Sequence, residues 1–198
     1  MNHNDYSPAG WKLLGSYPKG DPDGVGSWIL HNNGESALVE LPYGLRVTDV
    51  CTRVYRLGTL TYVCASHEHR DHLDWNMWKE VQYYFPYATY IRPHRCGYKK
   101  LNLGGEPLYI LECPKHSMTD CVIIFRGVAM TGDLELGIIH TVNDEVPLAT
   151  RRQSYQFLRD FPKSENYHIH TVMTAHLNDI RKDVDWPSLF PVEDTSHE

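Results

Sequence analysis

Apolar residues follow two different spacings in the first third of the chain, and these spacings predict its elements. Residues 27–41 predict a β-hairpin, because two apolar runs flank Asn32-Asn33-Gly34 and Asn-Gly supplies the positive φ angles of a tight turn. Residues 46–57 predict a helix, because apolar residues recur at helical spacing and Gly58 follows as a C-terminal cap. Residues 60–65 form an apolar run that predicts a buried strand.

A second helix is predicted after a polar loop, with Asp74 as its N-cap and Pro86 at its end. A third helix is predicted at residues 150–161, and five further strands at 87–91, 107–112, 121–125, 128–131 and 168–174. Strands and helices alternate in both halves, so the expected fold class is α/β. Prolines and acidic residues after Trp186 predict a short flexible tail from about residue 187.

Size and charge limit the domain count and the partners. A chain of 198 residues with 41% hydrophobic residues suits one domain, 1–198, with a sizeable core. Its net charge of -6 argues against a large nucleic-acid surface, which usually needs a basic patch. We therefore expect a small-molecule substrate and no nucleic-acid partner.

The compartment is predicted from the N-terminus and the cysteines. Residues 1–10 contain neither the basic nor the apolar region of a signal peptide, and no apolar run approaches the roughly 20 residues of a membrane helix. The five cysteines are odd in number and form no Cys-x-x-Cys pair, which favours reduced thiols. These features predict a cytoplasmic location without a membrane span.

The segment His67-Glu68-His69-Arg70-Asp71-His72 concentrates three imidazoles and a carboxylate directly after a predicted strand. His67 and His69 are two residues apart, so both rings project the same way in an extended stretch. Asp71 and His72 follow where the chain turns toward the next helix. Imidazole nitrogen and carboxylate oxygen suit zinc, and also iron or manganese. A solvated loop rich in histidine is the alternative interpretation.

This H-x-H-x-D-H arrangement resembles the signature of the metallo-β-lactamase superfamily, in the branch that contains glyoxalase II, RNase Z and the lactonases. That family places a His, an Asp and a His at the ends of later strands. Three residues here match that order, each at the end of a predicted strand: His116, Asp133 and His176. The resemblance covers roughly residues 25–180 and implies a four-layer αβ/βα sandwich.

The resemblance also implies two divalent metal ions, with zinc expected and iron or manganese as alternatives. It assigns to the first ion His67, His69 and His116. It assigns to the second ion Asp71, His72 and His176, with Asp133 bridging the two. Asp71 and Asp133 are therefore the candidate catalytic residues.

Two metals roughly 3.5–4 Å apart hold a hydroxide at neutral pH, so the resemblance implies a hydrolase that needs no side-chain nucleophile. The expected substrate is a small ester, thioester or lactone. A phosphodiesterase acting on a small nucleotide or a nucleic acid is the alternative. A redox variant is a third interpretation, but such relatives replace a site histidine by Glu, and this chain keeps His69.

Three positions depart from the pattern of many relatives without removing a ligand. Lys115 and Ala175 stand where glycine is common, and Glu40 stands where aspartate is common. We expect Lys115 to alter the surroundings of the site or the substrate mouth.

Several other polar residues are weaker candidates for the site. His168 and His170 alternate along a predicted strand, and we expect them to be satisfied by local hydrogen bonds rather than to support the metal ligands. The basic stretch His94–Lys100 and His140 are candidates for substrate contact, with a solvated loop as the alternative.

Overall fold

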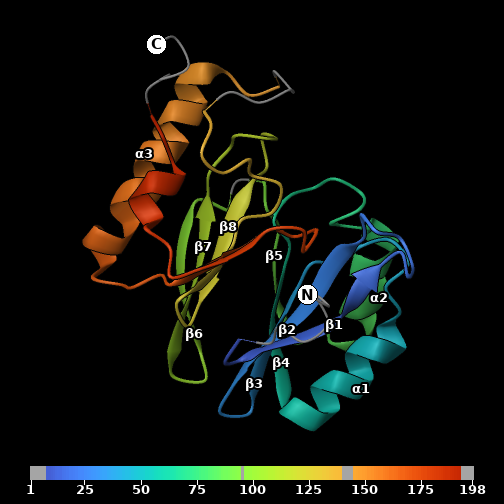
Figure 1. Ribbon diagram of the computed structural model, residues 1–198. Coiled ribbons are helices and arrows are strands. Elements are labelled where there is room, and N and C mark those ends of the chain that lie inside the picture. The colour runs from blue at the N-terminus through green and yellow to red at the C-terminus, as the bar shows by residue number, and fades with distance from the viewer. Residues whose placement is uncertain (1–7, 95, 140–144, 193–198) are drawn as a thin grey trace.

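The computed structural model describes residues 8–94, 96–139 and 145–192 (Figure 1). A first sheet contains five strands in the order β1-β2-β3-β4-β5. These strands are β1 (Trp11–Tyr17), β2 (Val25–Asn32), β3 (Glu35–Val39), β4 (Thr59–Cys64) and β5 (Thr89–Ile91). Neighbours β3, β4 and β5 are parallel, whereas β1, β2 and β3 are antiparallel.

A second sheet contains six strands in the order β11-β10-β9-β8-β7-β6. These strands are β6 (Tyr98–Leu103), β7 (Glu106–Glu112), β8 (Cys121–Phe125), β9 (Val128–Met130), β10 (Thr171–Met173) and β11 (Ile180–Lys182). Strands β9 and β10 are parallel, and the other neighbouring pairs are antiparallel.

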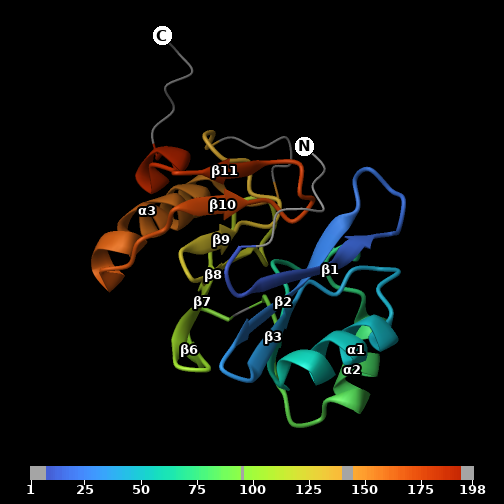
Figure 2. The same ribbon diagram turned by 60° about the horizontal axis from the view of Figure 1, so that its bottom comes forward.

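The helices lie on the outer faces of the two sheets (Figures 1 and 2). Helices α1 (Val47–Leu57) and α2 (Trp75–Tyr84) cover the first sheet, and α3 (Leu148–Glu165) covers the second. Alternate residues of one strand face different layers: Ile110 of β7 packs between the sheets, and its neighbour Leu111 packs toward α3. Both faces of each sheet are thus buried, which confirms the four-layer sandwich and explains the long apolar runs.

The local predictions in the first half are confirmed. The hairpin of β2 and β3 turns at Asn33 and Gly34, both with positive φ. Gly58 follows α1 with φ of 128° and donates its backbone N–H to the carbonyl oxygen of Val54. The carboxylate of Asp74 accepts hydrogen bonds from the backbone N–H groups of Asn76 and Met77, so Asp74 is the N-cap of α2.

Three strands were not predicted, and each has a physical reason. Strand β1 is interrupted by a register shift between Leu13 and Gly15. Strand β6 lies at a sheet edge, where the exposed Tyr98, Lys100 and Asn102 alternate with partly buried residues, so that the segment resembles a polar loop. Strand β11 has only three residues and is also an edge strand.

The chain after Trp186 differs from the expected flexible tail. Residues Trp186–Leu189 form a 3-10 helix, η2, that packs on α3. The Trp186 indole N–H donates to the carbonyl oxygen of Leu158, and Trp186, Leu189 and Phe190 are buried. Burial of these three apolar side chains therefore holds the segment in place, although its prolines and acidic residues predict a flexible tail. Residues 193–198 lie outside the described part of the chain.

None of the helices in the described part of the chain combines the length and the apolar character that a membrane span requires.

Candidate metal centre

The seven candidate ligands lie in loops that follow strands of both sheets. His67 to His72 come directly after β4 of the first sheet. The β7–β8 loop of the second sheet supplies His116, and the ends of β9 and β10 are followed by Asp133 and His176. The fold therefore brings together residues that are more than one hundred positions apart in the sequence.

We call His67, His69 and His116 the first ligand group, because one ligand atom from each lies within 4.8 Å of the others. The Nδ1 atom of His69 lies 3.1 Å from Nε2 of His67 and 3.4 Å from Nε2 of His116. Three imidazole nitrogens thus face one small volume.

We call Asp71, His72, Asp133 and His176 the second ligand group, which meets the same 4.8 Å criterion. Nε2 of His72 lies 3.2 Å from Oδ2 of Asp133, and Nε2 of His176 lies 3.4 Å from Oδ1 of the same carboxylate. The Asp71 carboxylate is 3.6 Å from His72 and 3.8 Å from His176.

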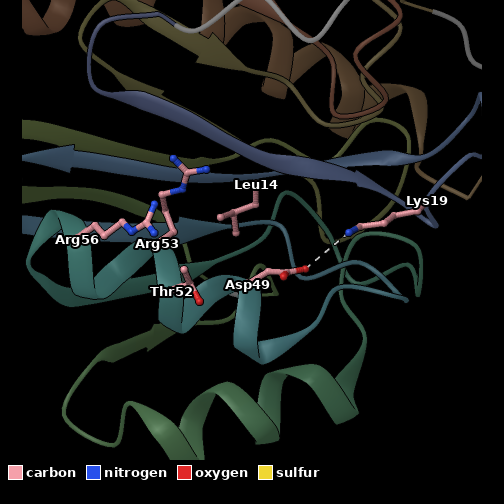
Figure 3. Close-up of a pocket in the computed structure, with 6 residues that line it drawn as sticks. All are labelled: Leu14, Lys19, Asp49, Thr52, Arg53 and Arg56. Carbon is pink, nitrogen blue, oxygen red and sulfur yellow. Dashed lines mark ion pairs between the residues drawn. The ribbon is translucent and has the colours of Figure 1, made fainter.

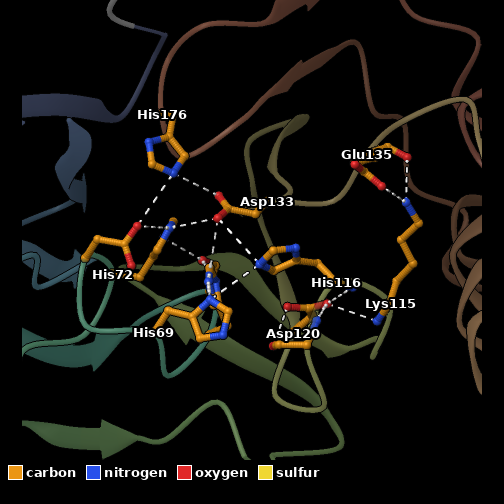
Figure 4. A network of polar contacts seen from close by, with 12 residues as sticks. His69, His72, Lys115, His116, Asp120, Asp133, Glu135 and His176 are labelled. Atoms are coloured by element: carbon orange, nitrogen blue, oxygen red, sulfur yellow. Dashed lines mark hydrogen bonds and ion pairs between the residues drawn. The ribbon is translucent and has the colours of Figure 1, made fainter. Parts of the chain in front are cut away.

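Asp133 faces both groups (Figure 4). Its Oδ2 atom lies 3.7 Å from Nε2 of His67 and 3.9 Å from Nε2 of His116, besides its contacts in the second ligand group. One carboxylate oxygen is thus near nitrogens of both groups, which is the position of a bridging ligand.

The donor atoms fit two divalent ions. Nε2 of His72 and Oδ1 of Asp133 are buried and have no hydrogen-bond partner. Buried polar atoms are normally satisfied, so unpartnered atoms aimed at one point indicate a missing ligand. Imidazole nitrogen and carboxylate oxygen suit zinc, iron and manganese.

The pKa values of the two most buried rings move in opposite directions. Burial lowers the pKa of His67 to about 2, helped by the nearby His72. His67 is thus neutral, as a metal ligand must be. Burial also disfavours a charged His72, but the carboxylates of Glu40 and Asp133 outweigh it and raise the pKa of His72 to about 10.

The pKa values of Asp133 and His176 reflect their mutual contact. Burial alone raises the pKa of Asp133, yet His176 and His72 overcome this and hold it well below its usual range. The Asp133 carboxylate, 3.4 Å from Nε2 of His176, raises the pKa of His176. Without a metal, the second ligand group thus contains a protonated His72 ring that faces an ionised Asp133 carboxylate.

Buried groups behind the ligands orient the rings. Ser66 Oγ lies 3.1 Å from Nδ1 of His67 and 3.3 Å from Nδ1 of His72. The fully buried Glu40 accepts the Ser66 backbone N–H at 3.1 Å and lies 3.6 Å from Nδ1 of His72. A side chain at Gly132 would meet Ser66 Cβ at 2.8 Å, so glycine allows this close packing.

His176 is oriented by a residue near the N-terminal end of the chain, Asp23. Its Nδ1–H donates to the backbone carbonyl oxygen of Asp23, in the loop between β1 and β2. This bond leaves Nε2 directed at Asp133.

Asp120 supports the site but was missed from the sequence. Its buried carboxylate accepts the backbone N–H groups of Lys115, His116 and Ser117 at 2.9, 2.6 and 2.8 Å. Ser117 Oγ donates to its other oxygen at 2.7 Å. The only signal in the sequence was an aspartate directly before a buried strand, and that signal does not say which groups the carboxylate meets.

The weaker candidates lie elsewhere. His168 and His170 are exposed before β10, whereas His176 follows it, and His170 Nδ1 is 2.9 Å from Thr171 Oγ1. Lys100, on β6, pairs with Glu165 of α3 at 2.8 Å. His94 is exposed in the loop after β5. Arg95 and His140 lie outside the described residues.

A separate pocket lies between α1 and β1 (Figure 3). Three of its lining side chains are cationic, namely Lys19, Arg53 and Arg56, and its one carboxylate, Asp49, is paired with Lys19 at 3.9 Å and with Arg46 at 3.0 Å. The lining contains neither imidazole nor thiol. The ligand groups above therefore remain the candidate site.

No family model matches the sequence, and no curated protein matches it either. Solved structures do match the fold. ETHE1 from Myxococcus xanthus has a TM-score of 0.66 at 15% identity, over 91% of this chain and 83% of that chain. The B3 metallo-β-lactamase BLEG-1 has a TM-score of 0.60 at 15% identity, over 87% of this chain and 93% of that chain.

A third match is the chemotaxis sensor ODP, described as a peroxy diiron species, with a TM-score of 0.55 at 13% identity. It covers 90% of this chain and 88% of that chain. The chain therefore has the metallo-β-lactamase fold, as the sequence predicted. The matches do not select the branch of glyoxalase II, RNase Z and the lactonases.

Proposed function

We propose that this protein is a dinuclear metal-dependent hydrolase acting on a small ester, thioester or lactone. The observation that carries the proposal is the convergence of seven ligand side chains in two groups around Asp133. The first ligand group would hold one ion and the second ligand group the other. Two divalent ions, when bound, supply a hydroxide near neutral pH and polarise the scissile bond.

The chain's own residues divide the remaining tasks. Asp133 holds the two ligand groups in a fixed relation, because one of its oxygens lies near nitrogens of both. Asp71 is the most exposed member of the second ligand group, with 52% of its side chain accessible, so its carboxylate can contact water or a leaving group. The buried His67 and His72 are shielded from water, which strengthens electrostatic interactions at the site.

We propose zinc as the metal, with iron or manganese as alternatives. The imidazole-rich donor set supports zinc. Iron is supported by the similarity to ODP, whose structure is described as diiron. Metal analysis of the purified protein decides between them.

A small substrate and a cytoplasmic location are parts of the same proposal. The net charge of -6 supports a small molecule over RNA or DNA. All five cysteines are free thiols, which supports a reducing compartment.

The test is turnover of a panel of substrates by protein of measured metal content. The panel contains a thioester, an aryl ester, a lactone, a cyclic and a linear phosphodiester, and a β-lactam, since a β-lactamase shares the fold. We expect close to two metals per chain and turnover of an acyl substrate that chelation abolishes. Cleavage of phosphodiesters alone would replace the proposal by the phosphodiesterase alternative.

A further inference from the structure

Lys115 is a lysine whose side chain is fully buried, directly before the candidate ligand His116. Its Nζ donates to the backbone carbonyl oxygen of Glu135 at 3.1 Å and to the Glu135 carboxylate at 3.2 Å. It also lies 5.6 Å from the centre of the Tyr155 ring. A buried ammonium is expensive to keep, so its partners need an explanation.

The ion pair joins two loops that each carry a ligand. Lys115 and His116 belong to the loop between β7 and β8, whereas Glu135 stands two residues after Asp133 in the loop after β9. Figure 4 shows Lys115 pointing away from the ligands toward Glu135, while His116 points toward Asp133. The pair therefore connects the loops behind the site, where it does not touch the ligand atoms.

Both ends of the connection are themselves anchored. The Asp120 carboxylate accepts the backbone N–H groups of Lys115 and His116, so the Lys115 backbone cannot shift independently of the ligand. The Tyr155 hydroxyl, on α3, donates to the carbonyl oxygen of Glu135 at 2.8 Å. Because both ends of the ion pair are anchored, a shift of one loop would move the other loop with it.

We propose that Lys115 and Glu135 are positioning residues whose ion pair, formed by the buried Lys115 ammonium and the half-buried Glu135 carboxylate, sets the separation of His116 and Asp133. His116 belongs to the first ligand group and Asp133 faces both groups, so this separation decides how the two groups share the Asp133 carboxylate. The inference rests on the proposed metal centre. It assigns to Lys115 a role toward the ligands themselves, beyond its packing in the core.

The decisive variant is Lys115→Met, which keeps the length and volume of the side chain but removes the ammonium. Glu135→Gln is the conservative partner, because it keeps the backbone carbonyl and an amide oxygen as acceptors for Nζ. The matched control is Lys100→Met, which breaks the exposed Lys100–Glu165 pair on β6 and α3.

The first measurement uses metal-free protein and follows amide hydrogen exchange. The His116 amide is bonded to Asp120, and the Leu134 amide to the carbonyl oxygen of Thr131. We expect both amides to exchange faster in Lys115→Met, in both loops at once, with a smaller change in Glu135→Gln. Lys100→Met should leave both amides unchanged.

The second measurement is zinc affinity by competition with a chromophoric chelator. We expect Lys115→Met to bind zinc about 10–100-fold more weakly, as is typical when a partner behind a ligand is removed. Glu135→Gln should fall between Lys115→Met and the wild type, and Lys100→Met should match the wild type. A purely structural role would lower the unfolding midpoint but leave the affinity of the folded protein unchanged.

The two proposals fail in different ways. A wild type that binds neither zinc nor iron nor manganese refutes the metal centre, and the exchange data then decide alone whether the ion pair couples the loops. Wild-type zinc affinity and wild-type exchange in folded Lys115→Met overturn the positioning role. If Lys115→Met does not fold, the same two measurements on Glu135→Gln decide, and unchanged values there overturn it.

Discussion

The two halves of the candidate metal centre are built in different ways. Four candidate ligands come from one loop of six residues, His67 to His72, whereas the candidates His116, Asp133 and His176 come from three separate loops of the second sheet. In the first half, the spacing of the ligands is set by the local chain. In the second half, the three ligands depend on contacts that hold separate loops together.

In the structure, each of His116, Asp133 and His176 has a contact that holds its loop or its ring in place. Asp120 binds the His116 loop, the Lys115–Glu135 pair reaches the loop of Asp133, and the carbonyl oxygen of Asp23 orients His176. The six-residue loop instead turns on itself: the backbone N–H groups of His72 and Leu73 both donate to the carbonyl oxygen of His69. A ligand far away in sequence thus needs a partner of its own.

The largest effect is expected from Asp133→Ala, because Asp133 is the separate ligand that faces both groups. Turnover of the substrate found in the panel should fall on the order of a thousandfold or more. Metal content should fall below two per chain. Asp160→Ala on the exposed face of α3 is the control, and it should retain both properties. Near-normal turnover by Asp133→Ala would refute a bridging role.

A smaller effect, confined to one group, is expected from Asp120→Ala. Three buried backbone N–H groups lose their acceptor, at about 1 kcal/mol each, so the free energy of unfolding should fall by roughly 3 kcal/mol. Zinc affinity of the first ligand group should weaken about 10–100-fold. Cobalt absorption spectra measured during titration distinguish the two groups.

The control for Asp120→Ala is Leu158→Ala, on the buried face of α3. It should lower stability by a similar amount, about 3 kcal/mol, through a cavity. Its metal affinity should stay normal. Equal loss of zinc affinity in both variants would show that general destabilisation is the cause.

The pH dependence of zinc affinity should come from one residue of each half of the centre: His72 in the six-residue loop and His176 in the loop after β10. The pKa of His72 is raised to about 10, so this ring carries an extra proton near neutral pH without a metal, and the pKa of His176 is raised in the same direction. Zinc must displace the proton on the ligating nitrogen, and its affinity should therefore rise by about tenfold per pH unit for each proton released. His67, with a pKa of about 2, contributes no proton in this range.

Calorimetry in two buffers of different ionisation enthalpy measures the proton release, at pH 6, 7 and 8. Protons should be released to the buffer at each pH. An affinity that does not change between pH 6 and 8 would contradict the protonated state of His72.

The smallest effect is expected from Cys113→Ala. Cys113 is fully buried, and burial raises the pKa of its thiol well above the usual value, so it is a poor nucleophile at neutral pH. Turnover should stay within about twofold of the wild type, since the proposed nucleophile does not come from a side chain. A loss of turnover with retained metal would assign this thiol a chemical role.

Sequence patterns were most informative where the determinants are local. The hairpin turn at Asn33-Gly34, the Asp74 cap and the His67–His72 loop each depend on neighbouring residues, and the structure has them as predicted. His116, Asp133 and His176 were found through the family resemblance and their positions after strands. Periodicity alone does not find them.

The remaining features depend on contacts distant in sequence. The sequence left open whether Lys115 alters the surroundings of the site or the substrate mouth. In the structure its ammonium is buried beside Glu135, behind the ligands, because the fold brings the loop after β9 against it. Trp186 is a second example. The prolines and acidic residues that follow it suggest a tail, but its ring is buried against α3 and its indole N–H donates to the carbonyl oxygen of Leu158. Sequence patterns do not predict such partners, because the contacts form only when the two sheets pack together.

Each proposed ion would take ligands from both sheets: the first ligand group joins β4 to the β7–β8 loop, and the second joins the same β4 loop to the ends of β9 and β10. A bound ion is thus a cross-link across the seam of the sandwich, one that exists only after the two halves have met. At a free metal concentration of one hundred times Kd, each such cross-link adds about 2.7 kcal/mol to the free energy of unfolding. The metal supply of the cell would then set the stability of this fold as well as its chemistry.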